Sequence, residues 1–264
     1  MLNFENQTDC FLTFYFIPSP HGVDWKSPRS TLISNLKNQL SLMPRKLGHV
    51  NVELSRAGKI EELTGMYSPR MDSIQQILLK GAGFGVMWHS FPGALEKKED
   101  LLEELPAYIK VGRLSFLRLK ISLSVFDRLK NYLTDYQELN VQKNYGLANR
   151  PLHKEGAGCT AFAVSFLDAV DLLPDVRNQW RVELNVPERL IGSPLRGQYV
   201  PISRIAFTKN WAEPTEKYKN IVFWDPDKMH NWVLRNTNLT VDHAPGHFID
   251  VSTVEVHNTP LWRA

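Results

Sequence analysis

Alternating apolar and polar residues predict a set of β-strands in the first half of the chain. In residues 49–54, the apolar side chains of Val50, Val52 and Leu54 occupy every second position. Side chains of a strand point alternately to its two faces, so this segment predicts a strand with one apolar and one polar face. A glycine-containing turn after it favours a hairpin with residues 59–64. Similar or aromatic-rich patterns predict further strands at residues 10–17, 84–91 and 113–124.

Apolar residues at helical spacing predict helices between these strands. Ser27 and Pro28 supply an N-cap and a proline at the first helical position for one of them. Ser124 is expected to cap another, whose apolar residues share one face. The helices predicted in this way are residues 28–43, 69–80, 96–105, the segment after Ser124, and the segment from Cys159 to Pro174.

The character of the chain changes after Pro174. Short β-like runs alternate there with turns that contain proline and glycine, and most of the tryptophans lie in this part. We therefore expect a core formed by residues 1–174 and a β-rich region of unknown role formed by residues 175–264. The second region would either extend the first sheet or form a small subdomain. Its expected strands are residues 180–186, 200–208, 221–224 and 248–256.

The composition is that of an ordinary globular protein, with 43% hydrophobic and 22% charged residues. The net charge of +3 is small and the lysines and arginines are scattered, so nucleic acid is not expected as a partner. The apolar run at residues 11–17 is too short for a signal peptide or a membrane span. We therefore expect a soluble protein without integral membrane association, either cytoplasmic or, if a leader has been removed, secreted.

The candidate chemistry starts with Cys159, which follows the glycine-rich segment KEGAG and begins an apolar helical run. In the first turn of a helix, free backbone N–H groups and the helix dipole stabilise a thiolate and can hold an oxyanion. Gly156 and Gly158 allow a sharp turn and leave room for a substrate. Two interpretations remain open: a nucleophile, or a buried core residue, which is a common role of free cysteine.

A nucleophilic cysteine needs a base, and His49 is the best candidate among the eight histidines. It lies on the polar face of the predicted strand, which would hold its ring rigidly. The alternative is an ordinary surface histidine. A third polar group should orient the imidazole, and the hairpin offers Glu62, with Glu61 and Thr64 close behind.

The choice among these three residues depends on the register of the hairpin. A two-residue turn would place Glu62 and Thr64 on the face that carries His49. A three-residue turn would instead place Glu61 there. Glu62 is the preferred candidate, and each of the three is otherwise an ordinary surface residue.

The segment GHVNVEL, followed later by NYGLANRPLHKEGAGCTAFAVSFL, resembles the circularly permuted branch of the papain-like NlpC-type cysteine hydrolases. That branch includes the YiiX-like enzymes and the lecithin:retinol acyltransferase group. In it the catalytic histidine comes first, on a strand, and the cysteine follows at the N-terminus of a helix. The resemblance covers residues 45–65 and 144–168. Gly158 stands where relatives often have Asn or Asp, and Thr160-Ala161 replaces Ser-Gly.

The resemblance implies an α+β fold, with a permuted papain-like core, an antiparallel sheet packed against helices, and a β-rich C-terminal extension. It also implies that Cys159 is the nucleophile, His49 the base, and Glu62 or a neighbour the orienting residue, with Tyr145 near the oxyanion. The implied activity is that of a cysteine peptidase, amidase or acyl hydrolase without a cofactor. Its substrates would be peptidoglycan-type peptides or lipid acyl groups.

Two other functions remain open. A non-catalytic binding protein on the same fold would use the tryptophan-rich C-terminal region as its binding surface. A metallohydrolase would use the His and Asp residues of WDPDKMHNW and VDHAPGHFIDV. However, Pro245-Gly246 prevents His243 and His247 from sharing a helical face, so no metal site is expected. The hydrolase interpretation requires contact between Cys159 and His49, so the geometry of these two residues distinguishes it from the others.

Overall fold

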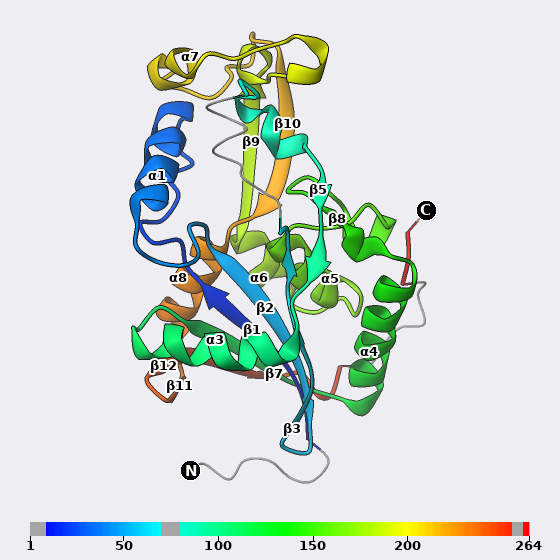
Figure 1. Ribbon diagram of the computed structural model, residues 1–264. Helices are drawn as coiled ribbons and strands as arrows, with labels where there is room; N and C mark the ends of the chain where they lie inside the picture. The colour runs from blue at the N-terminus through cyan, green and yellow to red at the C-terminus, as the bar shows by residue number, and fades with distance from the viewer. Residues whose placement is uncertain (1–8, 70–79, 255–260, 264) are drawn as a thin grey trace.

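A six-stranded mixed sheet lies at the centre of the molecule (Figure 1). The computed structural model describes residues 9–69, 80–254 and 261–263. The strands of the sheet are β1 (Cys10–Ile17), β2 (His49–Arg56), β3 (Lys59–Thr64), β7 (Ser115–Ile121), β11 (Leu239–Val241) and β12 (Ala244–Asp250). Their spatial order is β11-β12-β7-β1-β2-β3. Neighbours are antiparallel except β12 and β7, which run parallel, so the sheet is mixed where an antiparallel sheet was expected.

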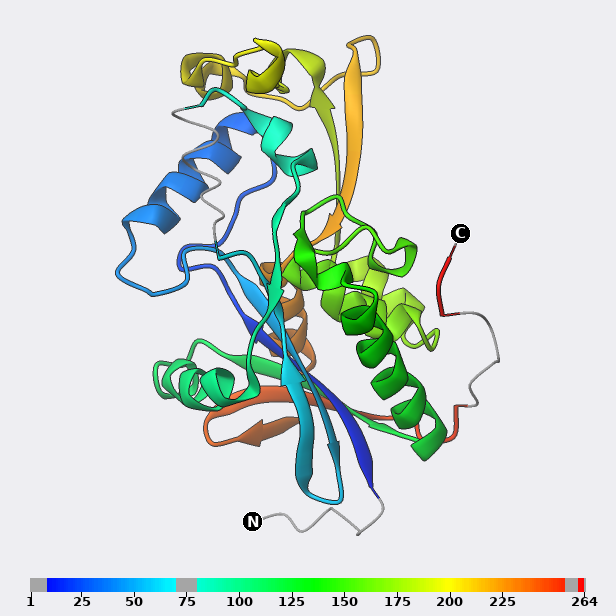
Figure 2. The same ribbon diagram turned by 45° about the vertical axis from the view of Figure 1, so that its right-hand side comes forward.

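Helices cover both faces of this sheet (Figure 2). The helices that pack on it are α3 (Lys98–Lys110), α4 (Leu123–Glu138), α5 (Cys159–Asp168) and α8 (Pro226–Asn236). The alternation in β2 explains the packing on one face of the sheet. Val50, Val52 and Leu54 point to that face and are buried in one apolar cluster with residues of α4, α5 and α8. Helix α3 packs on the other face, where Leu101 and Leu105 lie in a separate apolar cluster. The α+β class expected from the sequence is therefore confirmed.

A second packing unit surrounds a two-stranded sheet at the upper end of the molecule in Figure 1. Its elements are β9 (Arg181–Pro187), β10 (Tyr218–Trp224), α1 (Pro28–Leu40), α7 (Ile202–Phe207) and the 3-10 helix η1 (Phe84–Trp88). Leu32 of α1 and Phe84 of η1 belong to the same apolar cluster as Val186 of β9 and Ile221 of β10. Segments on both sides of Pro174 therefore build this unit, while β11 and β12 extend the central sheet.

Shorter elements connect these units. They are β4 (Met66–Tyr67), β5 (Phe91–Pro92), β6 (Ala94–Leu95), β8 (Asn144–Tyr145), α6 (Pro174–Gln179) and the 3-10 helices η2 (Val141–Lys143), η3 (Pro151–His153), η4 (Glu188–Leu190) and η5 (Pro194–Arg196). β4 pairs with β6, and β5 pairs with β8. These two small ladders lie beside the end of β2 where the candidate active site is found.

Most predicted elements of the first half are present, with shifted ends. Helix α1 begins at Pro28, and Ser27 caps it by accepting a hydrogen bond from the Ser30 N–H. The cap of α4 is Ser122 rather than Ser124. Helix α5 stops at Asp168, before the predicted end at Pro174, and Pro174 occupies the first position of the next helix. The helix expected at 69–80 lies almost wholly outside the described residues.

Two predicted strands are wrong. Residues 84–91 form η1 followed by the two-residue strand β5, and residues 202–207 form helix α7. Both segments bury a few apolar side chains against the upper unit, among them Phe84 and Ile205. A short apolar run is compatible with either structure, and tertiary packing decides between them. Among the described residues, the helices are all too short or too polar to cross a membrane.

Candidate active site

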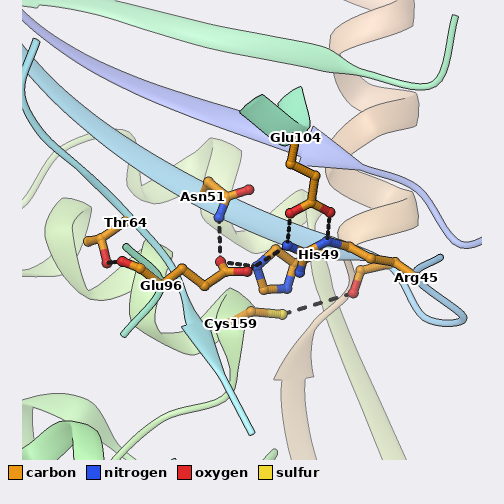
Figure 3. Close-up of polar contacts among 8 residues, drawn as sticks. Arg45, His49, Asn51, Thr64, Glu96, Glu104 and Cys159 are labelled. Carbon is orange, nitrogen blue, oxygen red and sulfur yellow. Dashed lines mark hydrogen bonds and ion pairs between the residues drawn. The ribbon is translucent and has the colours of Figure 1, made fainter. Parts of the chain in front are cut away.

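Strand β2 and helix α5 bring His49 and Cys159 together (Figure 3). His49 is the first residue of β2, and Cys159 is the first residue of α5. The two side chains are close enough for each to shift the pKa of the other: the thiolate raises that of His49, and the imidazolium lowers that of Cys159. The thiol also lies 4.0 Å from the carbonyl oxygen of Gly48. His49 is buried, so it is not the surface histidine that was the alternative.

The glycine-rich segment sets the start of α5. The N-cap is Gly158, which has no side chain to cap the first N–H groups of the helix. Gly156 has a φ of +96°, and a Cβ there would lie 2.1 Å from the carbonyl oxygen of Asn144. The turn therefore requires glycine at position 156. It delivers Cys159 to a helix N-terminus whose backbone donors are not used by a capping side chain.

The acid that contacts the imidazole is Glu96. Its Oε2 atom lies 2.7 Å from Nε2 of His49 and also accepts a hydrogen bond of 2.6 Å from Nδ2 of Asn51. Its other oxygen, Oε1, pairs with the Arg45 guanidinium at 2.5 Å. Because Nε2 is engaged by Glu96, Nδ1 is the ring nitrogen left to face Cys159. Figure 3 shows the ring between the carboxylate and the thiol.

Arg45 is itself held in place by a second acid. Its guanidinium makes two hydrogen bonds to Glu104 of α3, at 2.7 and 2.6 Å. Arg45 thus bridges Glu104 and Glu96, and all three side chains are labelled in Figure 3. A two-pronged arginine contact fixes orientation as well as charge. The carboxylate that orients His49 is therefore held by an ion-pair network that is anchored on α3.

A glycine lets Glu96 reach His49 from the neighbouring strand. Glu96 directly follows β6, and its backbone N–H donates to the carbonyl of Gly65, which lies between β3 and β4. A Cβ on Gly65 would lie 2.5 Å from Asn51 Nδ2, 2.5 Å from Glu96 Oε2 and 3.1 Å from His49 Nε2. The space that a side chain would fill is occupied by the carboxylate. Position 65 must therefore lack a side chain for this contact to form.

A β-bulge explains why Glu62 is not the orienting residue. The hairpin turns through two residues, but its register shifts between Leu54 and Ser55. Glu62 therefore pairs with Leu54, whose side chain lies on the apolar face of β2 and not on the face of His49. Leu54 is five residues from His49, or about 16 Å along a strand. Glu62 is too far along the hairpin to contact the imidazole.

The other two hairpin residues have different contacts. Glu61 forms ion pairs with Arg56 and Lys130, each at 2.6 Å. Thr64 donates a hydrogen bond of 2.9 Å to the backbone carbonyl of Glu96. Thr64 thus holds the backbone of Glu96 in place. Its hydroxyl donates to that backbone rather than to the imidazole, so Thr64 does not have the orienting role that was expected of it. Glu96 takes the place of the three hairpin residues that the sequence offered.

Charge determines the protonation of the His49–Glu96 pair. Burial lowers the pKa of His49, but the carboxylate of Glu96 and the thiolate of Cys159 outweigh burial and the Arg45 charge, and raise it to about 9. Burial raises the pKa of Glu96, but the charges and hydrogen bonds of His49 and Arg45 bring it down to about 2. At neutral pH the pair is therefore an imidazolium and a carboxylate.

The environment of Cys159 favours its thiolate. Burial raises the pKa of the thiol, but the charge of His49 and hydrogen bonds from His49, Tyr145 and the Val50 N–H hold it below the ordinary value. Tyr145, on β8, also lies against the backbone of Cys159, and its own pKa is raised by burial and by the nearby thiolate. The hydroxyl of Tyr145 therefore adjoins both the sulfur and the first N–H of α5.

Asp225 and Asp227, two of the C-terminal acids considered as metal ligands, have structural partners. Asp227 accepts hydrogen bonds from the backbone N–H groups of Ser19 and Val23, and Asp225 accepts one from the indole of Trp25. Within the described ranges, no group of three or more His, Cys, Asp or Glu side chains converges as a metal site would require.

The tryptophans of the C-terminal region pack inside the molecule. Trp180 and Trp232 are buried in the core cluster and lie edge to face, with ring centroids 5.8 Å apart. Trp224 and Trp262 are partly buried against the same cluster. These side chains fill the core and offer little exposed aromatic surface for a ligand. The arrangement gives no specific support to a binding role for this region.

Sequence reasoning did not identify Glu96 as part of the site. It placed this residue at the start of a charged surface helix, and α3 in fact begins at Lys98, after Glu96. The strand that positions it, β6, has two residues and no periodicity that could be recognised. Comparisons of the chain with protein-family models, with curated proteins and with solved structures found no match.

Proposed function

We propose that the protein is a cysteine hydrolase that cleaves an amide or ester bond, with Cys159 as nucleophile, His49 as base and Glu96 as the orienting acid. The observation that carries this proposal is the position of the His49 ring, which contacts both the Glu96 carboxylate and the Cys159 thiol. A nucleophile, a base and a third group that orients the base are the arrangement that nucleophilic catalysis requires.

The reaction follows from the protonation of the site. At neutral pH the thiol proton already rests on Nδ1 of His49, and the Cys159 thiolate attacks the carbonyl carbon of the substrate to form a sulfur–carbon bond as the carbonyl oxygen becomes an oxyanion. The imidazolium then donates its proton to the leaving amine or alcohol as the amide or ester bond breaks. Water, deprotonated by His49, attacks the resulting thioester. The products are a carboxylic acid and the free thiol.

The oxyanion of each tetrahedral intermediate would lie at the start of α5. The backbone N–H of Cys159 and the hydroxyl of Tyr145 lie beside the sulfur, and both can donate a hydrogen bond to the oxyanion. Preorganised donors of this kind contribute strongly to catalysis, because they stabilise charge that develops only during the reaction. This position supports the role near the oxyanion that the resemblance implies for Tyr145.

The resemblance suggests two classes of substrate, peptidoglycan-type peptides and lipid acyl groups. A substrate-independent test is to trap the acyl-enzyme with an activated ester such as p-nitrophenyl acetate and to measure the intact mass. We expect one acetyl group on Cys159, a slower reaction in His49→Ala, and none in Cys159→Ala. The matched control is Cys10→Ala, which should acylate like the natural chain. Equal acylation of Cys159→Ala and the natural chain would overturn the proposal.

A further inference from the structure

Apolar side chains project from one end of the molecule. The segment from Ile191 to Ala212 forms the yellow upper edge in Figures 1 and 2. On it, Leu195 is 93% exposed, Phe207 is 83% exposed and Tyr199 is 64% exposed. Large apolar side chains with so much exposure make few contacts with the rest of the chain. Their position therefore has no explanation in the packing of the fold.

The same segment is firmly attached to the upper unit by its other side chains. Val200 and Ile205 are buried in the apolar cluster around β9 and β10. The backbone N–H of Val200 donates to the carbonyl of Gly81 at 2.8 Å, and the indole of Trp211 donates to the carbonyl of Trp25 at 2.7 Å. The segment thus has an inner face that packs and an outer face that does not. The exposed residues are held outward by ordered structure.

The charges within residues 191–212 are all positive, and the nearest acids in sequence, Glu213 and Glu216, line a pocket with Phe207 and Lys209. Arg196, Arg204 and Lys209 are exposed, and the sequence from Ile191 to Ala212 contains no Asp or Glu. We name residues 194–209 the basic–apolar tip. The surface combines largely exposed apolar side chains with positive charges that have no acidic residue between them in the sequence. It is therefore complementary to an apolar phase bounded by negative charge.

We propose that the basic–apolar tip docks on an anionic lipid membrane surface. Leu195 and Phe207 would enter the acyl region, and Tyr199 would lie at the level of the headgroups, where tyrosine is favoured. Arg196, Arg204 and Lys209 would contact lipid phosphates.

The isolation of the side chains favours lipid over a protein partner. A protein interface needs a closely packed apolar core, whereas fluid lipid accepts separate protruding side chains without matching their shape. Leu195 and Phe207 protrude in this separate way. The proposal does not depend on the chemistry of Cys159, and Cys159→Ala should bind membranes like the natural chain.

The test is sedimentation of the full chain with vesicles of phosphatidylcholine, with and without phosphatidylglycerol. We expect binding to vesicles that contain phosphatidylglycerol, and weaker binding as salt is added. Leu195→Ser and Phe207→Ser should each weaken binding roughly tenfold, because each removes an inserted apolar side chain. Arg196→Glu with Arg204→Glu should abolish the preference for phosphatidylglycerol. The matched controls are Leu42→Ser and Lys110→Glu, which change exposed residues outside the tip.

Three results would overturn the proposal. The first is no binding to vesicles that contain phosphatidylglycerol. The second is binding that the tip variants and the control variants reduce equally. The third is a concentration-dependent dimer, seen by light scattering, that Leu195→Ser and Phe207→Ser dissociate, because the tip would then be an interface between copies of this chain. Circular dichroism of each variant confirms that loss of binding is not loss of folding.

Discussion

Nε2 of His49 lies 2.7 Å from Oε2 of Glu96, although His49 begins β2 and Glu96 follows β6. The segment with Gly65, whose carbonyl accepts from the Glu96 N–H, connects β3 to β4. The contact leaves the other ring nitrogen for Cys159. It also places a full negative charge, anchored by Arg45, behind the imidazole. The protonation of the candidate site is therefore controlled by a residue outside the hairpin that carries the histidine.

The first prediction concerns the charge of Glu96. Glu96→Gln keeps the shape of the side chain but removes its negative charge, so the pKa of His49 should fall from about 9. NMR titration of the His49 ring protons measures this shift. Glu62→Gln is the matched control and should leave the titration unchanged, because Glu62 pairs with Leu54 at the far end of the hairpin. Equal shifts in the two variants would contradict the assignment of Glu96.

The second prediction concerns Gly65. A methyl group there would lie 2.5 Å from both Asn51 Nδ2 and Glu96 Oε2, so Gly65→Ala should displace the carboxylate. We expect a loss of about 2 kcal/mol in the free energy of unfolding by urea, together with a lower pKa of His49. In the control Gly112→Ala the methyl group meets nothing within 4 Å, although φ there is +65°. That variant should lose about 1 kcal/mol through backbone strain and keep the pKa of His49. A Gly65→Ala protein with the natural titration would show that the glycine is not needed for the contact.

The third prediction concerns the dependence of stability on pH. The pKa of Glu96 is lowered to about 2, so its contribution is complete above its unfolded pKa of about 4.3 and is lost as pH falls through about 2. The pKa of His49 is raised to about 9, so its contribution is complete below about pH 6.5 and is lost as pH rises through about 9.

The free energy of unfolding of the natural chain should therefore be larger than that of Glu96→Gln. The difference should be greatest, about 3 kcal/mol, between about pH 4.5 and about pH 6.5. The difference should shrink on both sides of that window. Urea unfolding of both proteins at about pH 3, about pH 5.5 and about pH 9.5 measures it. A difference that is constant across these three values would contradict the charged pair.

The fourth prediction concerns Tyr145. Tyr145→Phe removes a hydroxyl that lies beside both the Cys159 sulfur and the Cys159 N–H. It should slow acylation by an activated ester about 100-fold. Tyr136→Phe is the matched control, because the hydroxyl of Tyr136 is buried without a hydrogen-bond partner among the described residues. It should acylate at the natural rate. If both variants react at the natural rate, Tyr145 has no part in stabilising the oxyanion.

The residues that the sequence could place are those carried by long, periodic elements. The alternation in residues 49–54 predicts β2 and the position of His49 at its start, and the apolar run after KEGAG predicts α5 with Cys159 in its first turn. Each of these follows from the burial pattern of one element. The contact between His49 and Cys159 depends on the packing of α5 against β2. The only sequence feature that indicated this packing was the order of two short motifs, the histidine first and the cysteine second.

The orienting acid could not be placed in the same way. The turn of the hairpin was predicted, but the bulge between Leu54 and Ser55 has no signature in the residues, and it moves Glu62 to the apolar side. Glu96 reaches the site through β6, which pairs with β4 over two residues. Pairing of such short strands depends on tertiary contacts and leaves no period in the sequence.

The most direct test of the central claim is the rate at which iodoacetamide alkylates the two cysteines near neutral pH, followed by peptide mass spectrometry. Both are largely covered, at 7% exposure for Cys159 and 1% for Cys10, but burial raises the pKa of Cys10 whereas His49 and Tyr145 lower that of Cys159. The account predicts fast alkylation of Cys159, at least about 10-fold slower alkylation in His49→Ala, and slow alkylation of Cys10 in both proteins. Equal, slow alkylation of both cysteines, unchanged by His49→Ala, would contradict it.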